Sequence, residues 1–121
     1  MFTISIEMQF KASHSVTLSH EEPEHEHFWA VSAEVSTDKL NANGVAVDFA
    51  LLKSKITDIT SKLTGAILND IDYFREKGPT AESVAVYIFE RLEPTLPNGA
   101  RLESVGVSEQ VGCCAKYSKD R

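Results

Sequence analysis

Residues 2–10 alternate strictly between apolar and polar side chains, and this alternation constrains the fold more than any other feature of the chain. The apolar side chains all occupy even positions: Phe2, Ile4, Ile6, Met8 and Phe10. Successive side chains of a strand point to opposite faces of a sheet, so a period of two predicts a strand with one buried face. Residues 28–37 repeat the pattern less regularly and predict a second strand, whose buried side would carry Trp29, Val31, Ala33 and Val35.

Two later segments have the three- and four-residue spacing of amphipathic helices. Asp48 is placed to cap the first helix, which we expect to end near Gly65. Its apolar positions are Phe49, Leu52, Ile56, Ile59 and Leu63. Thr80 is placed to cap the second helix, which ends before two prolines. Its buried stripe would consist of Val84, Ala85, Ile88 and Leu92.

The remaining segments complete the order of elements. The turn at 41–44 leads into a short predicted strand, Val45 to Val47. Residues 66–78 are less regular, and 102–107 with 111–117 predict a last strand or a bulged strand pair. The order β-β-β-α-α-β indicates an α+β fold, a four-stranded antiparallel sheet with two helices on one face. The other face must meet solvent or another subunit, and the apolar strand patterns favour self-association.

Length and composition predict a single domain, and they argue against nucleic-acid binding and against insertion in a membrane. A chain of 121 residues, 42% of them hydrophobic, predicts one domain over 1–121. The net charge of −6 leaves no cationic face for a nucleic acid. No apolar run approaches the roughly 20 residues that span a bilayer, and the amino terminus lacks a signal peptide, so we expect a soluble cytoplasmic protein without a membrane partner.

The two cysteines, Cys113 and Cys114, are adjacent in the sequence. Adjacent cysteines do not form a disulfide framework, and their use fits a reducing compartment. They are either ordinary thiols or groups with redox or metal chemistry.

All four histidines of the chain fall between positions 14 and 27: His14, His20, His25 and His27. His25 and His27 are two residues apart at the head of a strand, so their imidazoles project to the same side. His14 keeps the parity of Phe10, and a hairpin could bring it to the same point. Three histidines with an open fourth position form the catalytic type of zinc site. Solvated loop histidines are the alternative, and His20 is a fourth ligand, a proton donor or an exposed loop residue.

Glutamates surround the histidines. Glu21 and Glu22 lie in the predicted loop, where either one could act as a general base close to a metal. The alternative is a solvated acidic loop. Glu26 alternates with His25 and His27, and we expect it on the opposite face of the strand.

Six segments, in this order, resemble the 6-pyruvoyltetrahydropterin synthase and 6-carboxytetrahydropterin synthase family, which has the tunnelling fold (T-fold). Phe10-Lys11-Ala12-Ser13-His14 is similar to the first zinc-ligand segment, and His25-Glu26-His27 to a His-Gly-His pair. The strand-to-helix junction is matched by residues 44–49 with Leu52-Lys53. The other landmarks are Leu68-Asn69-Asp70-Ile71, Pro79-Thr80-Ala81-Glu82, and Val105-Gly106-Val107-Ser108-Glu109 followed by Tyr117.

The resemblance implies that His14, His25 and His27 hold a zinc ion, which binds the side-chain oxygens of a dihydropterin triphosphate or a related pterin. It implies that Glu109 anchors the pterin ring through paired hydrogen bonds. Thr80 would lie near the same pocket, although helix capping explains this residue equally well. It also implies homo-oligomers, trimers or hexamers, whose sheets close into a β-barrel with sites between subunits.

The chain departs from the family at the groups that transfer protons. Glu21 stands where the synthases have a catalytic cysteine, and Leu63-Thr64-Gly65 replaces a Leu-Asp-His segment. One branch of the family also has a glutamate in place of the cysteine, and it cleaves dihydroneopterin to 6-hydroxymethyldihydropterin. The resemblance therefore implies a zinc-binding lyase acting on a dihydropterin side chain, with Glu21 or Glu22 as base. The alternative is a non-catalytic or repurposed homologue that only binds zinc and a pterin- or purine-like ligand.

Overall fold

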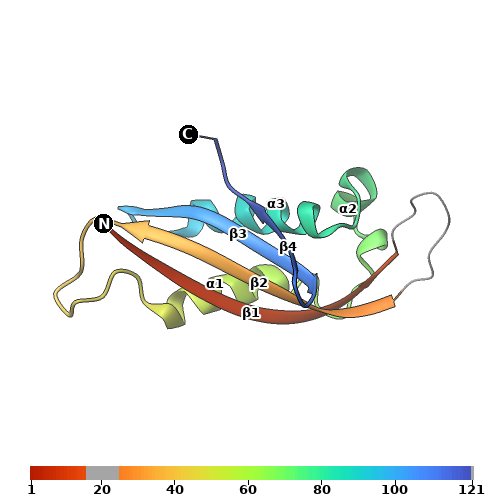
Figure 1. Ribbon diagram of the computed structural model, residues 1–121, viewed down its shortest axis with the longest axis horizontal. Coiled ribbons are helices and arrows are strands. Elements are labelled where there is room, and N and C mark those ends of the chain that lie inside the picture. The colour runs from red at the N-terminus through yellow and green to blue at the C-terminus, as the bar shows by residue number, and fades with distance from the viewer. Residues whose placement is uncertain (16–24, 121) are drawn as a thin grey trace.

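The computed structural model of the protein describes residues 1–15 and 25–120, and it has four strands and three α-helices in this part of the chain (Figure 1). The strands are β1 (Phe2–His14), β2 (His25–Thr37), β3 (Ala100–Gln110) and β4 (Cys113–Tyr117). The helices are α1 (Phe49–Thr60), α2 (Asp72–Lys77) and α3 (Ala81–Leu92), with two 3₁₀ turns, η1 (Leu68–Asp70) and η2 (Glu93–Thr95). The sheet has the order β1-β2-β3-β4 with every pair antiparallel, which confirms the predicted α+β fold.

Strand β4 takes the place of the short strand expected at Val45 to Val47, and that expectation is wrong. Residues 45–47 lie in a loop closed by Asn41, whose side-chain oxygen accepts hydrogen bonds from the backbone of Asn43 and Val45. These bonds occupy backbone donors that a strand would use in a ladder. The fourth strand instead follows a turn at Gly112, where a φ of +87° suits glycine.

The two hairpin strands are longer than their alternation indicated. Strand β1 continues from Phe10 to His14, and β2 begins at His25, because the two segments pair without interruption. The inward parity also continues, since Ala12 and His14 are buried on the same face as Phe10. Residues 11–14 are mostly polar, so hydrophobicity alone did not predict that the strand continues through them.

The helices differ from the expectation in three places. Helix α1 ends at Thr60, before Gly65, and a turn follows it. Phe49 is one of the regularly spaced apolar residues of this helix, but unlike Leu52 and Ile56 it is exposed. The stretch 66–78, expected to be irregular, contains η1 and the short helix α2. Two helix starts are confirmed: Asp48 accepts a hydrogen bond from the backbone of Ala50, and Thr80 accepts one from that of Ser83.

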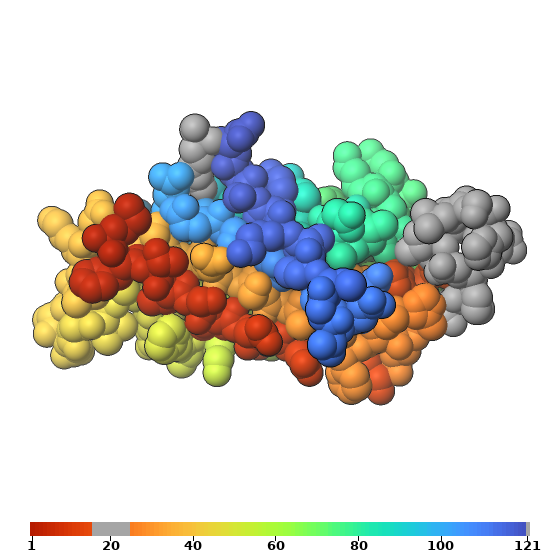
Figure 2. Space-filling view, in the orientation of Figure 1, coloured from red at the N-terminus to blue at the C-terminus, as the bar shows by residue number. Residues whose placement is uncertain are grey.

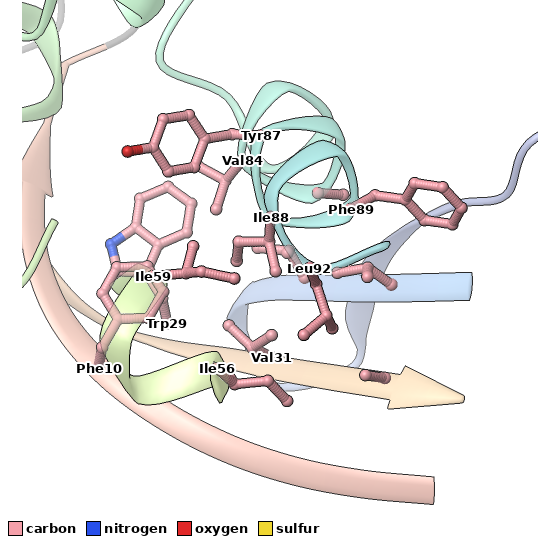
Figure 3. Close-up of a cluster of buried hydrophobic side chains, with 14 of the residues drawn as sticks. Phe10, Trp29, Val31, Ile56, Ile59, Val84, Tyr87, Ile88, Phe89 and Leu92 are labelled. Atoms are coloured by element: carbon pink, nitrogen blue, oxygen red, sulfur yellow. The ribbon is translucent and has the colours of Figure 1, made fainter. Parts of the chain in front are cut away.

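The core lies between one face of the sheet and helices α1 and α3 (Figure 3). The inward side chains of β2 are fully buried, as the parity predicted: Trp29, Val31, Ala33 and Val35. The helices contribute Ile56, Val84, Ile88 and Leu92 among others. Figure 2 shows the opposite side of the sheet, where strands rather than helices form the surface. None of the described helices is long and apolar enough to cross a membrane.

Candidate metal centre

The antiparallel pairing of β1 with β2 brings the three predicted ligands together. His14 lies directly opposite His25, and His27 lies opposite Ala12, so all three histidines lie on the core-facing side of the sheet. One ring nitrogen from each forms a group whose atoms lie within 4.8 Å of one another. The strand ends that carry this group, the end of β1 and the start of β2, lie at the same end of the sheet as η1 and α2 (Figure 1). The predicted convergence of His14, His25 and His27 is therefore present in the structure.

The three rings meet edge to face, and those of His14 and His27 also lie against the indole of Trp29. The ring centroids of His25 and His27 are 4.2 Å apart, and His14 lies 4.9 Å from His25 and 5.0 Å from His27. The centroid of Trp29 is 4.9 Å from that of His14, and its Nε1 donates a hydrogen bond to the carbonyl of Ala12. Trp29 thus supplies a rigid apolar floor, which lowers the local dielectric and strengthens electrostatic contacts at the site.

His14 is held in one tautomer by a backbone carbonyl. Its side chain is buried, and Nδ1 lies 2.6 Å from the carbonyl oxygen of Pro79. A carbonyl only accepts hydrogen bonds, so we assign the proton of the neutral ring to Nδ1. Nε2 is then left with its lone pair, which is the form that ligates a metal through Nε2.

Residues 65–69 support the end of β1 on the side away from β2. Gly65 donates a backbone hydrogen bond to the carbonyl of Lys11, and Ser13 donates one to Ala66. The side chain of Asn69 makes two bonds of 2.9 Å to the backbone of Ser15, accepting from its N–H and donating to its C=O. The strand that carries His14 is therefore fixed along both edges. Asn69 had no signal in the sequence beyond its place in the Leu68–Ile71 landmark.

The imidazole of His27 is held in its neutral form. Burial lowers the pKa of His27 below the ordinary histidine value, the neighbouring His25 and His14 lower it further, and the carboxylate of Glu109 opposes them. A neutral imidazole is the species that binds a metal, because protonation occupies the lone pair.

The donor atoms at this site fit a bound cation. In the part of the chain that the structure describes, three buried side-chain atoms lack a hydrogen-bond partner: His14 Nε2, His27 Nε2 and Glu109 Oε2. Buried polar atoms without partners are costly and uncommon in proteins. All three atoms belong to this one site, and each is a ligand that zinc accepts.

The structure describes two of the other residues singled out in the sequence, Thr80 and Glu26. Glu21, Glu22 and His20 lie outside the described residues. The hydroxyl of Thr80 accepts the backbone N–H of Ser83, which is the capping role. Glu26 lies on the opposite face, 3.2 Å from the amine of Lys11, as its alternation predicted.

Two further groups of residues singled out in the sequence are the two cysteines and the segment Leu63-Thr64-Gly65. Cys113 and Cys114 are free and exposed on β4. The hydroxyl of Thr64 donates to the carbonyl of Thr60 at 2.9 Å. Gly65 has a φ of +76° and open space where a Cβ would stand. These two positions therefore supply no titratable side chain in this chain.

Comparison with known proteins places the chain among pterin-related sequences. Residues 3–120 match the family described as 6-pyruvoyl tetrahydropterin synthase. The chain is 30% identical over 100 residues to dihydroneopterin monophosphate aldolase of Pyrococcus furiosus, covering 83% of this chain and 82% of that protein. It is 31% identical over 130 residues to 6-carboxy-5,6,7,8-tetrahydropterin synthase of Synechocystis, covering 100% and 96%.

Solved structures show the same fold. A 6-pyruvoyl tetrahydropterin synthase of Caenorhabditis elegans has a TM-score of 0.82 and 20% identity, over 98% of this chain and 96% of that chain. A 6-pyruvoyltetrahydropterin synthase of Plasmodium vivax in which a catalytic glutamate was replaced with alanine has a TM-score of 0.75 and 15% identity, over 99% and 98%.

Proposed function

The chain belongs to the 6-pyruvoyl tetrahydropterin synthase family, and from this premise we propose that it is a zinc-binding lyase acting on the side chain of a dihydropterin. The observation that carries the proposal is the convergence of His14, His25 and His27 within 4.8 Å at the end of the sheet. Three imidazoles on two paired strands match the donor set of a catalytic zinc site, which keeps a position open for substrate.

Each residue of the site has a distinct role in this proposal. The three histidines hold zinc, which when bound polarises the side-chain oxygens of the pterin. Glu21 or Glu22 removes the proton of a side-chain hydroxyl. The carbon–carbon bond next to that hydroxyl then breaks, the hydroxyl carbon leaves as an aldehyde, and the carbon that stays on the pterin takes up a proton to give the hydroxymethyl group. The Plasmodium vivax relative, with its catalytic glutamate, supports a carboxylate base. The Pyrococcus relative supports dihydroneopterin monophosphate as a substrate beside dihydroneopterin and its triphosphate. Thr80 would border the pterin pocket while capping α3.

A specific observation favours a second function, binding of a pterin- or purine-like ligand without catalysis. The hydroxyl of Thr64 is bonded to Thr60, and Gly65 has no side chain, so neither position can relay a proton as a histidine does. A homologue with zinc and a heterocycle pocket but no proton relay would bind its ligand and leave it unchanged.

Product analysis separates the two functions. We expect the zinc-loaded protein, incubated with dihydroneopterin, its monophosphate or its triphosphate, to release 6-hydroxymethyldihydropterin, detected by chromatography. Removing a general base costs about 10²- to 10⁴-fold in rate, so Glu21→Gln or Glu22→Gln should slow release by that factor. Glu26→Gln is the matched control, because Glu26 lies on the opposite face of β2. Pterin binding without product at any pH would reject the lyase.

We also propose that the functional unit is a homo-oligomer, a trimer or hexamer as the resemblance implies. The sheet face away from the helices exposes Phe28, and Val111 is exposed at the β3–β4 turn. Phe28 and Val111 line one hollow of the surface. Large exposed apolar side chains of this kind favour burial against another subunit. We expect size-exclusion chromatography with light scattering to give three or six times the chain mass of 13.4 kDa. A monomer would contradict this proposal.

A further inference from the structure

Strand β3 brings a carboxylate to the three histidines. Ser108 pairs with Ala30 across the β2–β3 ladder, so the next residue, Glu109, faces the same side as Trp29 and the histidines. Its Oε2 lies 2.9 Å from Nε2 of His14. The resemblance assigns Glu109 to the ring of a pterin, but this contact places the carboxylate against the metal ligands.

The contact between Glu109 and His14 does not have the geometry of a hydrogen bond. The two atoms are close enough for an ion pair, yet neither has a hydrogen-bond partner, so the alignment required of an N–H donor is missing. The proton of His14 belongs on Nδ1, which faces the carbonyl of Pro79. A nitrogen lone pair and a carboxylate oxygen therefore lie 2.9 Å apart, an arrangement that a shared cation stabilises.

The spacing of the two atoms suits one shared ion. Zinc binds histidine nitrogen and carboxylate oxygen at about 2.0–2.2 Å, so two ligand atoms of one zinc lie roughly 3 to 3.5 Å apart. The 2.9 Å between Glu109 Oε2 and His14 Nε2 is just below that range, so a small movement of the carboxylate would admit the ion. A carboxylate also offsets the charge of a divalent ion that three neutral imidazoles leave uncompensated.

We propose that Glu109 is the fourth protein ligand of the metal ion, beside His14, His25 and His27, when no pterin is bound. The inference rests on the metal site of the proposed function but not on its chemistry. The observation that carries it is that His14 Nε2, His27 Nε2 and Glu109 Oε2 are the unpartnered buried atoms of the described chain and share one site.

Zinc affinity tests the proposal without any measurement of activity. The metal-free protein is titrated with zinc in competition with a chromogenic chelator, as wild type, Glu109→Gln and Glu103→Gln. Glu103 is the matched control, because it lies on the same strand, its side chain is 34% exposed against 35% for Glu109, and it pairs with Arg101 instead. We expect Glu109→Gln to weaken zinc binding at least about 10-fold and Glu103→Gln to leave it unchanged.

Cobalt(II) in place of zinc gives a second readout, because its visible absorption depends on the number and type of its ligands. We expect the spectrum of the cobalt protein to change with Glu109→Gln and not with Glu103→Gln, while thermal unfolding of the metal-free variants shows that both are folded. Unchanged zinc affinity and an unchanged cobalt spectrum, together with weaker pterin binding, would overturn the proposal and leave Glu109 as a pterin anchor only. Failure of the proposed function gives a different result. In that case no pterin product would form, but Glu109→Gln would still weaken zinc binding and change the cobalt spectrum.

Discussion

Replacing His14 with alanine is expected to reduce zinc affinity more than about 100-fold, beyond the 10- to 100-fold cost of losing a residue that only supports a ligand. His14 is 1% exposed, and its ring lies within 5.0 Å of both other histidine rings. The carbonyl of Pro79 also fixes its tautomer, so that the lone pair of Nε2 is available to the metal. Metal analysis after gel filtration should find one zinc per wild-type chain and almost none in the variant.

The control for this experiment separates loss of a ligand from loss of the fold. The triple variant His14→Ala, His25→Ala, His27→Ala should bind no zinc, and circular dichroism of the metal-free proteins should show the same secondary structure in wild type and variants. A wild-type protein that binds no zinc would contradict the metal site itself. Full zinc occupancy in His14→Ala would exclude His14 as a ligand.

Replacing Trp29 with alanine is expected to lower the free energy of unfolding of the metal-free protein by about 3–5 kcal/mol. The side chain is completely buried, stacks on Phe10 at a centroid distance of 6.1 Å and donates a hydrogen bond to Ala12. The substitution leaves a cavity next to His14 and removes one hydrogen bond to the carbonyl of Ala12. Denaturant unfolding measures the stability, and we expect zinc affinity to fall as well because the floor of the site is lost.

The neighbouring residue supplies the control for Trp29. Phe28 is 64% exposed in the single chain and lies on the opposite face of β2, so Phe28→Ala leaves no cavity in the core and should lower the free energy of unfolding by less than Trp29→Ala, through lost contacts with another subunit only. Trp29→Phe keeps an aromatic ring but loses the hydrogen bond to Ala12. Its effect on the free energy of unfolding should lie between those of Phe28→Ala and Trp29→Ala. Equal effects of Trp29→Ala and Phe28→Ala would contradict the burial that places Trp29 beneath the site.

Alternation and helix caps predicted much of the fold because they are local properties. The alternation of residues 2–10 continues to His14, so that Ala12 and His14 are buried like Phe10. The composition of residues 11–14 does not by itself indicate a strand. The caps at Asp48 and Thr80 were found where a side chain bonds the backbone two or three residues later. The same local reasoning placed a strand at 45–47, where the side chain of Asn41 bonds the backbone instead.

The sequence by itself determined that His25 and His27 share one side of a strand and that His14 keeps the inward parity of β1, because a strand has a period of two. Only the tertiary structure decided what surrounds them. The carbonyl of Pro79 is 65 positions from His14, and Asn69 is 54 positions from Ser15. Glu109 joins His14 through the register of a third strand. No local period encodes such contacts, since they depend on strand pairing and helix packing that the whole core sets.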